Sequence, residues 1–228
     1  MGWVYEIAFT GDRALAEPLW RGLKDSLARD WSRLTGFTAL DIYRAIDDAA
    51  RDPFNDDKDG PLLLAVPEFA TAAQLAAARP AIEQALAALP AGVNVTVSAL
   101  ERKFYPVGEE ASPAPLSAPF SYVVRYHRPA EDEAAFIANY IATHPGTLAK
   151  LPHIRSVMCY FPIAGFEPGR FPAANYMIGN EVVFDSVEHF NMAMQSPVRQ
   201  ELRAHFHAFP KFTGLNTHYP MDRVRVVG

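Results

Sequence analysis

Two kinds of hydrophobic pattern alternate along the chain and predict the order of its elements. Runs of β-branched and aromatic residues predict strands, and apolar residues that recur every three or four positions predict helices with one buried face. The first half reads as strand, helix, strand, strand, helix and strand, over residues 3–9, 14–34, 37–46, 62–69, 71–89 and 93–105. The second half repeats this order over residues 120–127, 131–142, 154–163, 176–184, 187–209 and 218–227.

The two halves can be superimposed at a fixed offset. Phe69-Ala70-Thr71 and Phe184-Asp185-Ser186 lie 115 residues apart, each between a predicted strand and a predicted helix. Ser196-Pro197 suits the N-cap and first position of a new helix, so we expect a break there in the last long helix. The order predicts a tandem duplication of the ferredoxin-like β-α-β-β-α-β unit. We place a degenerate first unit at 1–107, a linker at 108–117 and a second unit at 118–228.

The strands are apolar on both sides, which predicts that both faces of each sheet are covered. Helices would cover one face, and the sheet of the other unit would cover the second. The expected fold class is therefore α+β, with the two units forming an intramolecular barrel. A cleft is expected between each sheet and its helices. This pseudo-dimer needs no partner chain, although a homodimer stays open.

Composition narrows the range of functions. The net charge of −5 gives no basic surface for nucleic acid, and no apolar run approaches the roughly 20 residues of a membrane span. Cys159, the single cysteine, cannot form an internal disulfide, so a reducing, cytoplasmic location is expected. Residues 47–60 contain six Asp and predict a solvated acidic loop.

A series of short motifs in the second half resembles a known family. In order they are Tyr126-His127-Arg128-Pro129, Tyr140 followed by His144-Pro145, the segment from Glu181 to Ser186, and Ser196-Pro197. This series resembles EthD-like proteins of the dimeric α/β-barrel superfamily, over about residues 118–228. The resemblance implies a small ligand pocket in each unit. It also implies relatives that include cofactor-free oxygenases, cyclases, isomerases and haem-binding enzymes.

All seven histidines lie in the second half, and His144 is the strongest catalytic candidate among them. Tyr140 precedes it by four residues and shares its helix face. Because Pro145 should end the helix, His144 is expected at a helix C-terminus, where the dipole favours its protonated form. An imidazole beside a phenol could move a proton to or from a ligand.

Further residues are expected to line the same cleft. The predicted ligand-binding residues are Phe136, Arg125, Tyr126, His127 and His218. Arg125 could hold a carboxylate or an enolate. No metal-binding motif is evident, and neither a metal nor another cofactor is expected.

The preferred hypothesis is a metal-free enzyme for a small hydrophobic, carbonyl-bearing or aromatic metabolite. It would work by general acid/base chemistry, as a cyclase, isomerase, decarboxylase or cofactor-free monooxygenase. One alternative is a non-catalytic binding or accessory protein for a degradative oxygenase, so catalysis itself is left open. A second alternative is haem binding, with His205 or His207 as axial ligand.

Overall fold

The computed structural model describes residues 2–46, 50–55, 60–108, 118–166 and 169–227, whose strands close into one eight-stranded barrel. The strands are β1 (Gly2–Thr10), β2 (Phe37–Ala45), β3 (Leu63–Phe69), β4 (Asn94–Tyr105), β5 (Phe120–His127), β6 (Ser156–Pro162), β7 (Tyr176–Phe184) and β8 (Asn216–Val227). The α-helices are α1 (Ala16–Gly22), α2 (Ala28–Trp31), α3 (Ala72–Ala85), α4 (Glu133–Leu148), α5 (Val187–Met194) and α6 (Pro197–Ala208). Shorter turns are the 3-10 turns η1 (Arg13–Leu15) and η3 (Leu86–Ala88) and the π-helical turn η2 (Leu23–Leu27).

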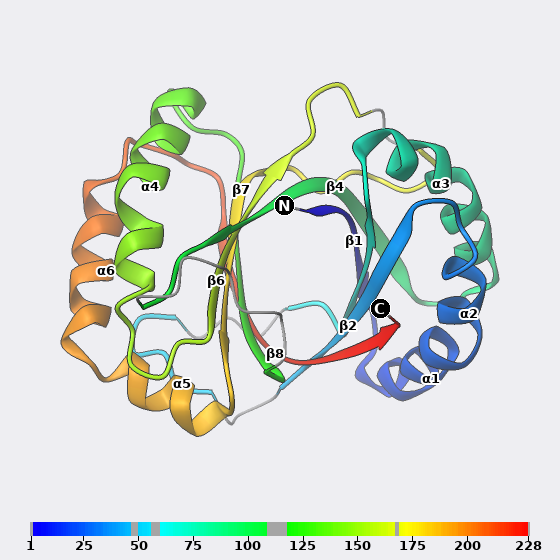
Figure 1. The fold of residues 1–228 in the computed structure, drawn as a ribbon, viewed down its shortest axis with the longest axis horizontal. Helices are drawn as coiled ribbons and strands as arrows, with labels where there is room; N and C mark the ends of the chain where they lie inside the picture. Colours follow the sequence, from blue (N-terminus) through cyan, green and yellow to red (C-terminus); the bar gives the residue numbers. More distant parts are fainter. Residues whose placement is uncertain (1, 47–49, 56–59, 109–117, 167–168, 228) are drawn as a thin grey trace.

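The strand order around the barrel shows how the two units combine. The order is β1-β3-β2-β8-β5-β7-β6-β4, so each unit contributes four adjacent strands in the same ferredoxin-like arrangement. The units meet at two antiparallel seams, β2 with β8 and β4 with β6. Helices α1, α2 and α3 lie on one side of the barrel, and α4, α5 and α6 lie on the other (Figure 1). The predicted fold class and the intramolecular barrel are confirmed.

The duplication is visible at the start of two equivalent helices. The Thr71 hydroxyl accepts a hydrogen bond from the backbone N–H of Gln74 at 3.2 Å. The Ser186 hydroxyl accepts one from the N–H of His189 at 3.3 Å. Both residues are N-caps and lie at the predicted offset. The predicted break is also present, since α5 ends at Met194 and α6 begins at Pro197.

The unit boundaries stay a prediction. Apart from Gly108, the predicted linker 108–117 lies outside the described residues. Among the helices of the described ranges, none combines the length and the apolar character needed to cross a bilayer.

Helix α4 is longer than predicted. It continues through Pro145 to Leu148 instead of ending near residue 142. Phe136, Tyr140 and His144 follow each other at four-residue spacing, and with Leu148 they bury one continuous face. This packing offsets the cost of a proline inside the helix, which breaks one backbone hydrogen bond. His144 therefore lies inside the helix and not at its C-terminus.

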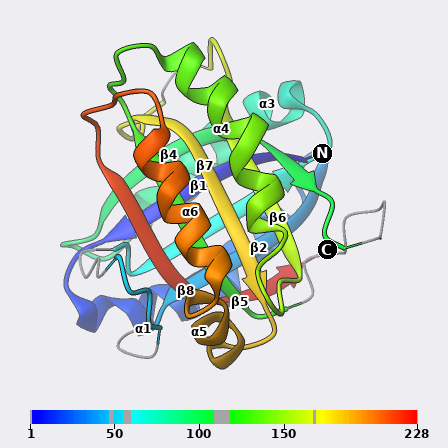
Figure 2. The same cartoon turned by 90° about the vertical axis from the view of Figure 1, so that its left-hand side faces the viewer.

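Strand β5 shows how one sheet serves two environments. Phe120, Tyr122, Val124 and Tyr126 face the helices of the second unit and join its apolar core. The alternate residues point into the barrel, because successive side chains of a strand project to opposite faces; Val123 packs in the core shared by both units. Figure 2 shows α4 and α6 lying over the sheet on the helix-facing side.

The barrel interior is more polar than the sequence pattern suggested. Glu6 of β1 pairs with Arg125 of β5, and both side chains are buried. At the β2–β8 seam, Asp41 pairs with Arg223 at 3.1 Å. The carboxylate of Glu181 accepts hydrogen bonds from the hydroxyls of three other interior residues, Ser121, Tyr160 and Tyr43.

Candidate active site in the second unit

The cleft between the second unit's sheet and its helices α4 and α6 contains a small cavity. Its volume is about 60 Å³, room for about two water molecules at the volume water takes in the liquid. The lining includes these residues of the second unit: Tyr122, Val124, Tyr126, His144, Leu148, Leu151, Asn180, Val182, Met194, Arg199, Leu202, Arg203, Phe206 and His218. Asp52 and Asn55 of the first unit complete it. The site is thus assembled from both halves of the chain.

His144 lies on the wall of this cavity with a neutral ring. Only 6% of its surface is exposed, and among the described residues its Nδ1 has no hydrogen-bond partner. Burial, together with the nearby His205 and Arg199, lowers the pKa of His144 to about 3. The expectation that a helix end would favour the protonated form was therefore wrong. The imidazole is therefore unprotonated at neutral pH, and it can accept a proton only where a nearby anion stabilises the charged ring.

Tyr140 lies behind the cavity wall. Its ring centre is 4.8 Å from that of His144, and its hydroxyl oxygen accepts a hydrogen bond of 2.5 Å from the Asn180 amide. Burial raises the pKa of Tyr140 well above its usual value, so the phenol keeps its proton. Since Tyr140 does not line the cavity, it can orient Asn180 and His144 without touching a ligand in this conformation.

A carboxylate from the first unit closes the cavity mouth. Asp52 accepts hydrogen bonds from Arg199 Nη2 at 2.8 and 2.9 Å and from the Tyr122 hydroxyl at 2.8 Å. Burial alone would raise the pKa of Asp52, but Arg199 and the hydrogen bonds from Asn55 and Phe54 lower it below its usual value. Asp52 is therefore an anion at neutral pH, in contrast to the solvated acidic loop that we predicted. The loop residues 47–49 and 56–59 lie outside the described residues.

Two further contacts hold the described segment 50–55 against the second unit. The Phe54 ring lies 4.8 Å from the Arg199 guanidinium and 5.2 Å from that of Arg203. The Arg51 backbone N–H donates to the Asn191 side-chain oxygen at 2.7 Å. We call residues 50–55 the cap segment.

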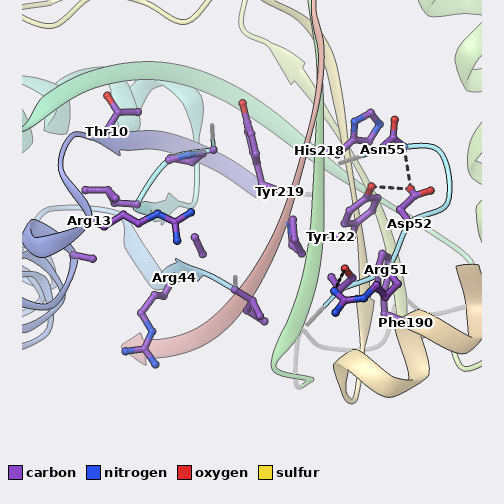
Figure 3. A pocket seen from close by; sticks show the side chains of 18 of the residues that line it. Thr10, Arg13, Arg44, Arg51, Asp52, Asn55, Tyr122, Phe190, His218 and Tyr219 are labelled. Atoms are coloured by element: carbon purple, nitrogen blue, oxygen red, sulfur yellow. Dashed lines mark hydrogen bonds between the residues drawn. The ribbon is translucent and has the colours of Figure 1, made fainter. Parts of the chain in front are cut away.

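A second and larger cavity adjoins the first at the cap segment. It has a volume of about 550 Å³ and lies where the ends of β1, β2 and β8 meet. Its lining shares Asp52, Asn55, Tyr122 and His218 with the small cavity. Figure 3 shows Arg13 and Arg44 toward one end, and Tyr122, Asp52 and Asn55 at the other. The cap segment thus separates the two cavities.

Two of the predicted ligand-binding residues lie at the cleft, and one lies deeper. Tyr126 and His218 line the small cavity, and the His218 ring stacks on Tyr122 at 5.8 Å. Phe136 is fully buried between Phe209 and Phe212 and is not part of the lining. Phe136 therefore supports the packing of the helices around the site.

Arg125 and His127 lie elsewhere than expected. Both are on the barrel side of β5, opposite to Tyr126. Arg125 is 2% exposed and pairs with Glu6, while His127 Nε2 lies 3.2 Å from the Thr217 hydroxyl. Burial and the charge of Arg125 lower the pKa of His127. The strand periodicity could have predicted this separation, because neighbouring residues face opposite sides.

The sequence reasoning missed the residues that define the mouth. Asn180 had a visible signal, as an amide within an otherwise apolar strand. Arg199 looked like one of many charged positions on a helix. Asp52 gave no signal at all, because its contacts to Arg199 join residues 147 positions apart.

The equivalent region of the first unit holds an apolar core and one buried carboxylate, Glu83. Leu19, Trp31, Leu75 and Ile82 belong to its apolar core. A loop from the second unit covers it through Phe166, whose ring centre lies 6.0 Å from that of Tyr5. Each unit therefore sends a loop onto the other. The loop on the first unit contributes Phe166 and the Arg170 N–H that binds Glu83, and the loop on the second contributes the Asp52 carboxylate.

The histidines proposed for haem do not share one pocket. His205 is half-buried near His144, with ring centres 6.2 Å apart, while His207 is exposed. A cavity of about 60 Å³ is far smaller than a porphyrin. The cleft in this conformation does not fit a haem group.

Fold and cleft together define a protein of the dimeric α/β-barrel class, in its single-chain duplicated form. No family model and no curated protein sequence matches the chain. Among solved structures, an anthrone oxidase-like protein aligns with 98% of the chain and 91% of its own length, at 12% identity and a TM-score of 0.59. A candidate monooxygenase from Lactobacillus acidophilus aligns with 100% of the chain and 95% of its own length, at 11% identity and a TM-score of 0.56.

An EthD family protein from Bacillus halodurans aligns with 43% of the chain and 96% of its own length, at 21% identity and a TM-score of 0.35. The two neighbours that align with nearly the whole chain support its barrel fold. At these identities they establish the fold and leave the activity open.

Proposed function

We propose that the protein is a small-molecule enzyme that removes a proton from a hydrophobic, carbonyl-bearing or aromatic metabolite, with His144 as the base. The observation that carries this proposal is the buried, neutral imidazole of His144 on the cavity wall. Its buried Nδ1 has no hydrogen-bond partner among the described residues, so none of these residues competes with a ligand for this atom. A positioned base of this kind contributes about 10²–10⁴-fold to a rate.

The surrounding groups suit an enolising reaction. Asn180 lines the cleft and its amide is held by the Tyr140 hydroxyl through a 2.5 Å hydrogen bond. Apolar side chains, among them Val182, Met194 and Leu202, line the cleft beside the polar groups at its mouth. Loss of a proton next to a carbonyl would leave an enolate, and cyclisation, isomerisation and cofactor-free oxygenation can all start from that intermediate. The anthrone oxidase-like and monooxygenase-type neighbours are compatible with this chemistry, although their likeness concerns the fold.

The test measures proton exchange directly and needs no knowledge of the natural product. 2-Tetralone, a bicyclic ketone, is incubated in D₂O buffer, and loss of its α-proton signals is followed by NMR. We expect wild-type protein to accelerate exchange over buffer and His144→Gln to lose about 10²-fold or more of that acceleration. Tyr140→Phe should retain part of it, since Tyr140 acts through its neighbours.

A native near-UV circular dichroism spectrum of His144→Gln serves as the folding control. Equal exchange by the folded variant and the wild type would show that His144 is not the base. Tight binding of 2-tetralone without any acceleration would favour the alternative of a carrier or accessory protein. That alternative is supported by the fact that no carboxylate among the described residues contacts the His144 ring to stabilise an imidazolium ion.

A further inference from the structure

The second unit's cleft is closed by a charged contact that a ligand could replace. Arg199 is 9% and Tyr122 7% exposed, and both direct their polar groups at the Asp52 carboxylate. A guanidinium matches a carboxylate in shape and charge, and binds it through two parallel hydrogen bonds. Asp52 belongs to the first unit, whereas Arg199 and Tyr122, which bind its carboxylate, both belong to the second.

The cap segment also decides how large the cleft is. With the cap in place, the cavity beside His144 holds only about 60 Å³, whereas ligand sites usually measure about 300–1,000 Å³. The 550 Å³ cavity lies on the other side of Asp52, Asn55 and Tyr122. Withdrawal of the cap segment, either in spontaneous opening or on displacement by an anion, would join the two cavities and give a bicyclic or larger molecule access to His144.

The charges around the larger cavity favour an anion on this route. Arg13, Arg44 and Arg51 line it. Arg199 would be a buried and unpaired cation without Asp52, which is strongly unfavourable unless another anion takes its place. An incoming carboxylate could therefore replace Asp52 at little net electrostatic cost.

The comparison with the first unit supports a functional reading of the cap. There the covering loop places Phe166 against Tyr5, and its Arg170 backbone N–H donates to the buried Glu83 carboxylate, which also accepts from the Tyr5 hydroxyl. In that contact the carboxylate belongs to the covered unit itself. In the second cleft the carboxylate comes from the covering segment, and a cavity with a buried imidazole lies behind it.

We propose that Arg199 and Tyr122 form a binding site for the carboxylate of a hydrophobic, aryl-carboxylate ligand, and that Asp52 occupies this site until the ligand displaces it. The proposal rests on the proposed function in taking the second cleft as the ligand site. It adds the ligand's anionic group and the residues that recognise it. His144 would then face the ring or carbonyl portion of the bound molecule.

The first experiment compares two probes that differ mainly in charge. Binding of 2-naphthoate and of neutral 2-naphthol is titrated by fluorescence against wild type and Asp52→Asn at pH 7. We expect Asp52→Asn to bind 2-naphthoate about tenfold more tightly or better, a change of about 1.4 kcal/mol. The gain for 2-naphthol should be much smaller, because it cannot pair with Arg199.

Two variants make the result specific. Adding Arg199→Gln to Asp52→Asn should abolish the preference for naphthoate over naphthol. The exposed Asp30→Asn on α2 should behave like the wild type in every titration. Equal affinities of wild type and folded Asp52→Asn for naphthoate would overturn the proposal, as would an equal gain for both probes.

A measurement on the wild type covers the case in which Asp52→Asn does not fold. The amide N–H of Arg51 is hydrogen-bonded in the closed cap to Asn191 of the second unit. Its hydrogen exchange should accelerate when 2-naphthoate saturates the protein. Unchanged or slower exchange at this amide would contradict displacement of the cap.

These outcomes are separable from those of the proposed function. Naphthoate binding involves no proton abstraction, so it can succeed even if His144→Gln exchanges 2-tetralone normally. Conversely, His144-dependent exchange can stand while the cap variants show no effect on anion binding.

Discussion

A buried imidazole beside cationic groups has a much lower pKa than an exposed one. For His144 this determines how the ring can act as a proton acceptor. Its pKa of about 3 keeps the ring neutral across the physiological range. The same desolvation makes the protonated ring costly, so proton abstraction would need an anionic product nearby. A carboxylate or enolate bound in the cleft would supply that charge.

The lowered pKa of His144 predicts a pH-dependent stability. Because the folded-state pKa lies below the unfolded value of about 6.5, protons bind preferentially to the unfolded chain between these values. The contribution of the neutral His144 to the free energy of unfolding is fully present above a pH of about 6.5. Below that pH it is lost by about 1.4 kcal/mol for each pH unit. Urea unfolding at pH 7 and pH 5 should therefore show a larger loss for wild type than for His144→Gln.

The matched variant removes the background from other groups. Asp52 also has a lowered pKa, but its contribution is lost only at lower pH, below its unfolded value of about 3.9. The other six histidines are present in both proteins. Parallel losses in wild type and His144→Gln would show that His144 titrates normally.

At the scale of elements, periodic hydrophobic patterns predicted strands and a helix break correctly. Contacts between residues that are distant in sequence could not be predicted from them. The strands β5 and β7 begin and end at the predicted residues, and the helix break at Ser196-Pro197 is present. Helix α4 was predicted too short, because the local effect of Pro145 is weaker than the packing of a whole helix face. The cap segment could not be predicted, since nothing near Asp52 in sequence indicates Arg199.

The two equivalent helix caps give a prediction at this scale. Thr71→Ala and Ser186→Ala each remove a side-chain acceptor for a backbone N–H of the first helical turn. Each should lower the free energy of unfolding by about 1 kcal/mol, measured by urea denaturation. Thr143→Ala, at an exposed position in the middle of α4, is the control and should cost less. A similar loss in all three would exclude capping as the cause.

At the scale of the whole molecule, the units share one continuous sheet and should unfold as one. Tryptophans and histidines report on different units. Trp3, Trp20 and Trp31 all lie in the first unit, and every histidine lies in the second. Tryptophan fluorescence and histidine NMR signals should therefore give coincident urea transitions. Two separate midpoints would show that the units are independently stable.

The buried ion pairs at the β2–β8 seam should contribute most to the joint unfolding of the two units. Asp41 contacts Arg223 at 3.1 Å and Arg225 at 2.9 Å across the junction of β2 and β8. Asp41→Asn would leave Arg223 buried without its counter-charge, a loss of about 3–5 kcal/mol. Chemical denaturation would measure it, and Asp25→Asn on the exposed surface of the first unit should change stability little. A loss below 1 kcal/mol for Asp41→Asn would mean that water or rearrangement compensates the charge.

The charges inside the barrel differ between the two halves of the chain, so each half pairs differently with the other half than with a copy of itself. The first unit supplies Glu6 and Asp41, and the second supplies the arginines that they meet, Arg125 and Arg223. Each unit also holds one interior residue of the other sign, Arg102 in the first and Glu181 in the second, so two copies of one unit would bring an excess of like charge together inside the barrel. Such like-with-like pairing is penalised by repulsion between buried charges. The interior charges thus favour the pairing of the two unlike halves within one chain over the pairing of identical halves.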